Sequence, residues 1–252
     1  MNLILEVGLN HFGKIRESKK YLDFFLKSNF KFLTYQIQKE SFYKKFNFKL
    51  PLDHYKSLIK KTHQKKKKIG LAVADINSCK EIAMLNFDFY KILSISLNDK
   101  KLINFIVKFN KPIFISCGTA SNSQIKKCIL NFKNHERKQI RLIHTSLSYD
   151  AIDQNLKRIQ LLKNFLPDIA YGHHYKNYLP LILLLNSDIK YFFIYIKSID
   201  SNKRFYPDDK HAFSFKKLKK LNEIMVESHN LLGSKNKRNK HIKTINDEKV
   251  SF

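Results

Sequence analysis

A short segment near the start of the chain places polar groups that could take part in a reaction at the end of an apolar run. In LEVGLNHFG, Glu6 stands among apolar residues and is followed by Asn10 and His11. A carboxylate inside an apolar strand is costly to bury without a partner, so we interpret Glu6 as a functional group. A surface carboxylate on an edge strand is the alternative. The segment is typical of a strand that delivers chemistry to its carboxyl end.

The same pattern recurs further along the chain. Lys91 stands in FYKILS, where an ammonium suits a phosphate or carboxylate and a solvated lysine is the alternative. Ser116 and Gly118 lie in SCGT, whose small residues and free amides suit an anion but also form ordinary strand-to-helix turns. His144 closes IRLIH and is the best metal-ligand candidate, with a structural histidine as the alternative. Other polar residues that follow apolar runs are Thr34, Gln36, Ser94, Thr145, Ser146, Gly172, His173 and His174.

Elements of two alternating kinds must position these residues. Apolar runs rich in Ile, Phe and Val predict eight strands, at residues 3–8, 30–37, 69–74, 89–93, 112–116, 140–144, 169–172 and 191–196. Segments with helical spacing lie at 18–28, 52–63, 78–85, 98–108, 121–131, 155–165, 179–185 and 215–232. This alternation predicts an α/β fold, a single-domain (β/α)8 TIM barrel, with its chemistry at the carboxyl ends of the strands.

Composition limits the partners that we expect. The 252-residue chain carries a formal net charge of +27, nearly all from lysines spread along it. Because these lysines are mixed with many Asn, Ile and Phe residues, we interpret them as compositional bias and expect no nucleic-acid partner. A positive surface still attracts acidic metabolites. The barrel is expected over residues 1–232, and 233–252 lack a core pattern and predict a flexible basic tail.

The cysteines and the termini point to a compartment. Cys79, Cys117 and Cys128 have neither metal-ligand nor paired disulfide spacing, which favours a reducing environment. The start of the chain lacks the pattern of a secretory signal. The apolar stretch 178–196 is interrupted by polar residues around Asp188, so a helix, a turn and a strand explain it better than a bilayer span. We therefore expect a cytoplasmic protein without a membrane partner.

Several segments together resemble one known family. EVGLNHFG is similar to E-I-G-x-N-H-x-G, FYKILS to Y-K-I-A-S, KPIFISCGTAS to K-P-I-I-L-S-T-G-M-A-T, and LIHTSLSY to L-L-H-C-T-S-x-Y-P. Asn155-Leu156 matches an N-L pair, and HAFSF from His211 is similar to H-A-F-S-L. The matches occur in order from Leu5 to about Leu232. This pattern resembles the N-terminal barrel of the N-acetylneuraminate (sialic acid) synthase family, which includes pseudaminic and legionaminic acid relatives.

The resemblance implies a reaction and a set of site residues. It implies condensation of phosphoenolpyruvate with an N-acetylated aldose such as N-acetylmannosamine, in surface carbohydrate biosynthesis, with a divalent metal, Mn or Mg. Glu6 would act near both substrates, on the water or a sugar hydroxyl, and Lys91 with Ser94 and Ser116 would hold phosphoenolpyruvate. His144 would be a metal ligand, with His174 as the candidate for the second. The remaining residues implied in substrate binding are Asn10, Gln36, Gly118, Ser146, Asn155 and His211.

The sequence also departs from the family pattern. Thr34 stands where the family has a strand-two lysine, and Lys176 stands at the second metal histidine when GHHYKN is aligned on its glycine, which leaves His173 or His174 as substitutes. The family's E-K-H-F on strand eight reads IYIK. We expect no counterpart of the family's C-terminal antifreeze-like domain. Two alternatives stay open: a homodimer or a separate C-terminal-domain protein completing the enzyme, and a non-catalytic barrel that binds a sugar, phosphate or protein in the same pathway.

Overall fold

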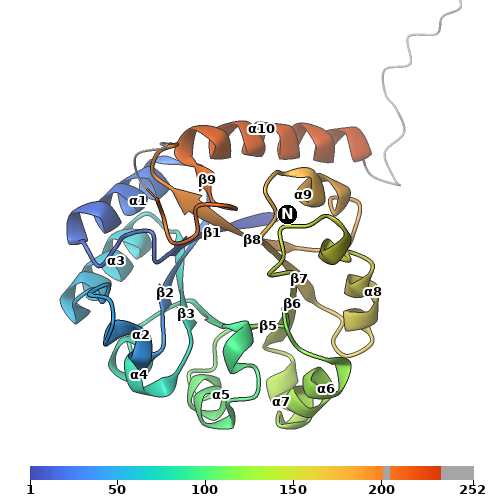
Figure 1. The fold of residues 1–252 in the computed structure, drawn as a ribbon, viewed down its shortest axis with the longest axis horizontal. Coiled ribbons are helices and arrows are strands. Elements are labelled where there is room, and N and C mark those ends of the chain that lie inside the picture. The colour runs from blue at the N-terminus through green and yellow to red at the C-terminus, as the bar shows by residue number, and fades with distance from the viewer. Residues whose placement is uncertain (201–204, 234–252) are drawn as a thin grey trace, which may run out of the picture.

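The computed structural model describes residues 1–200 and 205–233, and these form a closed barrel of parallel strands ringed by helices (Figure 1). Each strand pairs with the next along the chain, and β1 also pairs with β8, which closes the barrel. The predicted (β/α)8 fold is confirmed. The barrel strands are β1 (Asn2–Gly8), β2 (Phe32–Ile37), β3 (Lys68–Val73), β4 (Phe89–Ile92), β5 (Ile113–Ser116), β6 (Ile140–Thr145), β7 (Ile169–His173) and β8 (Tyr191–Lys197).

The helices lie between the strands and cover the outside of the barrel (Figure 1). Each predicted helix is present, although the one expected over 155–165 begins only at Arg158. The structure adds two one-turn helices, α2 and α7, and two 3-10 turns. The helices are α1 (Ile15–Lys27), α2 (Glu40–Tyr43), α3 (Leu52–Gln64), α4 (Ile76–Ala83), α5 (Lys100–Val107), α6 (Asn122–Leu130), α7 (Asn134–Arg137), α8 (Arg158–Lys163), α9 (Leu179–Leu183) and α10 (Phe215–Leu232), with η1 (Ser94–Ser96) and η2 (Ile152–Gln154).

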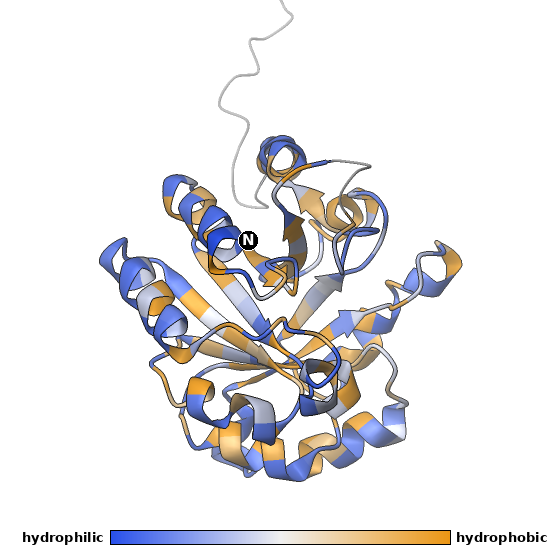
Figure 2. Ribbon diagram, turned by 60° about the vertical axis from the view of Figure 1, so that its left-hand side comes forward, coloured by the Kyte–Doolittle hydropathy of each residue, from blue (hydrophilic) through white to orange (hydrophobic). Residues whose placement is uncertain are grey.

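The apolar core has two layers, because alternate residues of a strand point to opposite faces. A small inner cluster fills the barrel and includes Ile4, Phe114, Ile143 and Phe193. A larger outer cluster lies between strands and helices, where amphipathic helices such as α1 bury one face. Figure 2 shows the result as apolar segments along the strands and helices of mixed polarity. A strand residue that directly precedes or follows a member of the inner cluster therefore faces the helices.

A short ninth strand, β9 (Phe213–Ser214), was not predicted and fixes the last connection of the barrel. Phe213 pairs with Ile196 on β8, and Ser214 caps α10 by accepting a hydrogen bond from the backbone N–H of Lys217. Phe215 then stacks on Phe24 of α1 with ring centroids 4.1 Å apart. Residues 205–212 are thereby anchored at their carboxyl-terminal end, beside the carboxyl end of β8.

Two further expectations concern the ends of the chain and the membrane. The predicted tail, residues 233–252, lies outside the described residues except for Gly233. In the described ranges, no helix has the length and apolarity needed to cross a membrane. The three cysteines are buried and free.

Candidate active site at the barrel mouth

A buried ion pair crosses the interior of the barrel. The Nζ of Lys91 on β4 donates to Oε1 of Glu6 on β1 at 2.6 Å, and the two residues are only 3% and 2% exposed. The Lys91 Nζ also lies 4.9 Å from the ring centroid of Phe193 and 5.6 Å from that of Tyr195. Aromatic faces attract an ammonium, so these rings help to hold Lys91 in place. The two residues expected to act in catalysis are thus in contact.

The second oxygen of Glu6 has no hydrogen-bond partner among the residues that the structure describes. Oε2 is buried, and burial raises the pKa of Glu6 above its ordinary value, while the charge and hydrogen bond of Lys91 act in the opposite direction. A buried carboxylate with one free oxygen and a raised pKa is suited to accept a proton. Among the described residues, the ion pair with Lys91 is the contact that favours the ionised form of Glu6.

A second carboxyl group, which sequence reasoning missed, enters the same site. Asp208 comes from the connection between β8 and β9, and its buried Oδ2 has no hydrogen-bond partner within the described part of the chain. Burial and the charge of Glu6 raise the pKa of Asp208 to about 7. The only sequence signal was the acidic pair in PDDK, directly before the HAFSF match. The two carboxyl groups at the mouth, both with raised pKa values, therefore compete for protons.

Gly8 makes room for this carboxyl group. The strand pairing shifts between Glu6 and Gly8, which marks a bulge, and Gly8 has a φ of +55°. A Cβ at Gly8 would collide with the Asp208 carboxylate and lie 2.7 Å from Cε1 of Tyr195. Bulges of this kind commonly re-aim side chains next to active sites. Here the bulge lets Asp208 approach the end of β1.

Asn10 positions the site through bonds to the protein itself. Its Nδ2 donates to the carbonyl of Ile196 at 2.9 Å, and its Oδ1 accepts from the backbone N–H of Asp208 at 3.1 Å. Asn10 is fully buried. Both polar groups of its side chain are therefore engaged. This expected substrate-binding residue links β1 to β8 and to the Asp208 segment by hydrogen bonds.

Two imidazoles and a phenol form the wall after β7 and β8. The rings of His174 and His211 stack with centroids 4.4 Å apart, and the Tyr195 ring lies 4.9 Å from that of His211. The Tyr195 hydroxyl donates to Oε1 of Gln36 at 3.1 Å. Burial, with Lys91 and Lys197 nearby, lowers the pKa of His211 to about 4, and burial also lowers that of His174. Both imidazoles are neutral at pH 7 and can accept hydrogen bonds.

Hydroxyl and amide groups meet at the ends of β4 and β5. The Oγ atoms of Ser94 and Ser116 lie 2.8 Å apart, and the Gly118 N–H donates to Ser94 Oγ at 3.3 Å. A Cβ at Gly118 would lie 2.9 Å from Cγ2 of Thr145, so the glycine allows this close approach. The structure brings these three expected residues together, and hydroxyl donors of this kind suit an anion.

Three other expected residues lie at the end of β6 or after it. His144 is on the outward face of β6, because its neighbour Ile143 belongs to the inner cluster, and its ring nitrogen Nε2 lies 2.9 Å from the carbonyl of Gln154. Ser146 accepts a hydrogen bond from the N–H of Ser148. Asn155 is exposed and has a φ of +36°, so it acts as a turn residue before α8.

The metal expected from the resemblance has no ready set of ligands. Within residues 1–200 and 205–233, no three His, Cys, Asp or Glu side chains are grouped so that they could hold a metal ion. The residues present therefore do not fit a preformed metal centre, and we assign no chemical step to one.

Thr34 stands at the family's lysine position. It is 1% exposed and pairs in register with Glu6.

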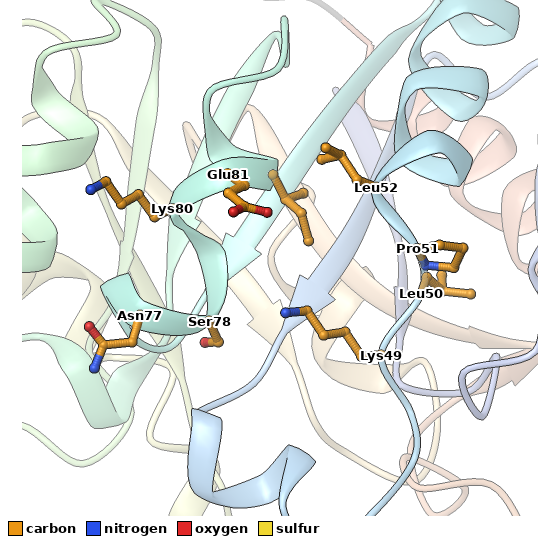
Figure 3. Close-up of a pocket in the computed structure, with 9 residues that line it drawn as sticks. Lys49, Leu50, Pro51, Leu52, Asn77, Ser78, Lys80 and Glu81 are labelled. Atoms are coloured by element: carbon orange, nitrogen blue, oxygen red, sulfur yellow. The ribbon is translucent and has the colours of Figure 1, made fainter.

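A cavity of about 480 Å³ lies between the segment before α3 and helix α4 (Figure 3). It is lined by the segment before and at the start of α3, Lys49–Leu52, and by α4 residues that include Ser78 and Glu81. The Ser78 hydroxyl donates to the carbonyl of Gln38, which is a structural contact. Since this cavity holds none of the expected site residues, we place the chemistry at the barrel mouth.

Sequence comparison gives the relatives of this chain. It is 27% identical over 202 residues to the N,N'-diacetyllegionaminic acid synthase of Campylobacter jejuni, covering 68% of this chain and 60% of that protein. It is 26% identical over 150 residues to pseudaminic acid synthase of the same species, covering 57% of this chain and 42% of that protein. The chain thus spans only about half of the length of these relatives.

Solved structures and a family model agree with this comparison. The fold matches an N-acetylneuraminic acid synthetase from Leptospira borgpetersenii with a TM-score of 0.82 at 20% identity, covering 94% of this chain and 86% of that one. It matches a spore coat polysaccharide biosynthesis protein from Bacillus subtilis with a TM-score of 0.76 at 19% identity, covering 92% and 68%. The model of the NeuB family matches residues 14–237. Because that match covers most of the 252 residues, the chain belongs to the NeuB family.

Proposed function

We propose that this chain condenses phosphoenolpyruvate with an N-acetylated aldose to form a nonulosonic, sialic-type acid for surface carbohydrate biosynthesis in the cytoplasm. The observation that carries the proposal is the buried Glu6–Lys91 pair, set beside the second carboxyl group of Asp208. Buried charge of this kind is costly and is typical of a site that uses it. Family membership supplies the reaction class.

The anionic substrate binds where the cation and the hydroxyl groups lie. The Lys91 ammonium and the Ser94 and Ser116 hydroxyls are donors for the phosphate and carboxylate of phosphoenolpyruvate. An anion at Lys91 competes with Glu6 for the same charge. Glu6 then loses the contact that favours its ionised form, and its pKa rises further. Anion binding is thereby coupled to proton uptake by Glu6.

The condensation forms one carbon–carbon bond and releases phosphate. The methylene carbon of phosphoenolpyruvate attacks the aldehyde carbon, and the aldehyde oxygen takes up a proton. Water adds to the former enol carbon, and its proton passes to a carboxylate at the mouth, Glu6 or Asp208. Collapse of that carbon breaks its bond to the phosphate oxygen and leaves a keto group. Two carboxyl groups with raised pKa values can hold and return the protons that this sequence needs.

A non-catalytic barrel that binds a sugar, a phosphate or a protein partner is the second candidate. The neutral hydroxyl of Thr34, beside Glu6, favours it, because it supplies no charge for an anion. The Thr34 hydroxyl donates at 3.3 Å to the carbonyl of Tyr35.

The test measures phosphate release from phosphoenolpyruvate with N-acetylmannosamine and related N-acetylated aldoses, with and without manganese. We expect aldose-dependent release that Glu6→Gln abolishes and that the matched variant Glu81→Gln, in the outer cavity, leaves unchanged. Circular dichroism of each variant controls for folding. No release from folded protein with any aldose, with or without manganese, would favour the non-catalytic barrel.

A further inference from the structure

A second cavity, of about 390 Å³, adjoins the barrel mouth on the side of β7 and β8. Three segments line it: the loop after β7, the connection between β8 and β9, and the first turns of α10. Its volume is within the range of small-molecule sites. Its charged lining residues are Lys176, Lys197, Lys210, Lys217 and Lys220, against the single acidic residue Asp209.

Two of these lysines have no ion-pair partner in the described part of the chain. Lys197 pairs with Asp209 at 2.8 Å, and Lys217 pairs with Asp200 at 3.2 Å. Among the residues described, no acidic side chain lies within ion-pair distance of Lys176 or Lys210. The cavity therefore keeps an excess of positive charge at a point where three segments of the chain converge.

The first turns of α10 add further positive charge, at the end of the helix where positive charge is unfavourable. Negative side chains favour the first turn of a helix, because the N-terminal end of the helix dipole is positive. The first turn of α10 has no acidic residue and carries Lys216 and Lys217 instead, followed by Lys220 in the next turn. A bound anion would relieve this unfavourable placement. Local rules of this kind are commonly broken at functional sites.

A buried imidazole with an unused nitrogen also lines the cavity. His211 is 6% exposed, and its buried Nε2 has no hydrogen-bond partner in residues 1–200 and 205–233. Its ring lies 4.9 Å from the ring of Tyr195, which in turn lies 5.6 Å from the Nζ of Lys91. One aromatic ring thus separates the cavity from the Glu6–Lys91 pair.

We propose that this cavity binds the phosphate group of a phosphate ester, with Lys176 and Lys210 as its charged contacts and His211 Nε2 as a polar one. In (β/α)8 barrels generally, loops after the seventh and eighth strands often form such phosphate sites. The ligand is either a phosphorylated second substrate or a free phosphate compound that regulates the site. Phosphate binding by this cavity does not depend on the proposed reaction. Only the assignment of the ligand as a second substrate rests on the proposed function.

The test measures the dissociation constant of N-acetylmannosamine 6-phosphate by calorimetry at fixed ionic strength. We expect the double variant Lys176→Gln, Lys210→Gln to bind about tenfold more weakly than the wild type. The matched control Lys80→Gln, Lys108→Gln removes the same charge from exposed positions on two other cavities and should change the constant less than twofold. Equal losses in both double variants, or equally tight binding of unphosphorylated N-acetylmannosamine, would overturn the proposal.

Two further arms identify the source of the phosphate. Inorganic phosphate that binds as tightly as the ester, and is weakened by the same double variant, identifies a site for a free anion. An ester that binds more tightly and also raises phosphate release from phosphoenolpyruvate identifies a second substrate. If no aldose supports phosphate release, the proposed function fails, and the binding constants still decide whether the cavity takes a phosphate group.

Discussion

The Glu6–Lys91 pair is the central feature at the scale of single residues. Two charges in a dry interior are costly to desolvate, and their mutual attraction does little more than offset that cost. The pair therefore contributes little to net stability but holds both groups where the substrate is expected. What matters for stability is the loss of one partner, because the other is then left charged and buried.

Lys91→Met should destabilise the protein by about 3–5 kcal/mol, because it leaves the buried Glu6 carboxylate without its ion-pair partner. Adding Glu6→Gln to the same chain should recover most of that loss. The free energies of unfolding in urea at pH 7 measure both effects. A single variant as stable as the wild type would mean that Glu6 is already protonated in the folded protein.

Asp208→Asn should remove a titration near pH 7. Between an unfolded pKa of about 4 and the folded pKa of about 7, the folded state holds an extra proton, so Asp208 makes stability fall as the pH rises through this window. The variant should lose this slope, and its phosphate-release profile should lose an inflection near pH 7. Urea unfolding from pH 4.5 to 8 measures the slope, with exposed Asp153→Asn as the control. An unchanged slope in Asp208→Asn would show that Asp208 ionises as it does in solvent.

Sequence reasoning found part of this site. Glu6 and Lys91 were visible because a charge in an apolar run needs an explanation. Asp208 was not, because it stands in a polar connection, and only the chain path through β9 brings it over Gly8. The direction of His144 was equally hidden, since strands of a parallel barrel are apolar on both faces and their pattern does not show which face is inside.

At the scale of elements, the eight strands were predicted to within two residues at each end. Long apolar runs between helical patterns leave little ambiguity in a barrel of this kind. The two-residue strand β9 and the one-turn helices α2 and α7 were missed, because elements so short carry no period in the sequence. The bulge at Gly8 was also not predicted, although it shapes the site most directly.

Gly8→Ala should cost more stability than Gly233→Ala, and the difference measures the crowding at the bulge. Both glycines have positive φ values, +55° and +63°, so backbone strain lowers the free energy of unfolding in both variants. At Gly8 the new Cβ meets atoms of Asp208 and Tyr195, whereas no atom of the described residues lies within 4 Å at Gly233. We expect a difference of at least about 1 kcal/mol in the free energy of unfolding. Equal losses would show that the Asp208 segment moves aside at little cost.

At the scale of the whole molecule, buried neutral histidines should make the barrel sensitive to acid. Burial lowers the pKa of His11 and His173 to about 3 and that of His211 to about 4. A lowered pKa means that the unfolded chain binds more protons once the pH falls below about 6.5, so stability is lost in that direction. Each such histidine should cost about 2 kcal/mol at pH 5 relative to pH 7.

One variant isolates this effect from the carboxyl groups, which act with the opposite sign. His173→Phe keeps an aromatic ring against Phe213 and removes the titration. Its loss of unfolding free energy between pH 7 and pH 5 should be about 2 kcal/mol smaller than that of the wild type. His135→Phe, at an exposed position, is the matched control and should leave that loss unchanged. Parallel changes in both variants would contradict the assignment.

The pairing of β1 with β8 also sets an order of events during synthesis. The first strand leaves the ribosome early, yet the residues opposite it, Tyr191 to Tyr195, follow nearly two hundred positions later. Until then one edge of the nascent sheet stays open, and contacts of such long sequence separation are slow to form. Glu6 and its supporting residues on β8 therefore meet only when almost all of the barrel has been translated.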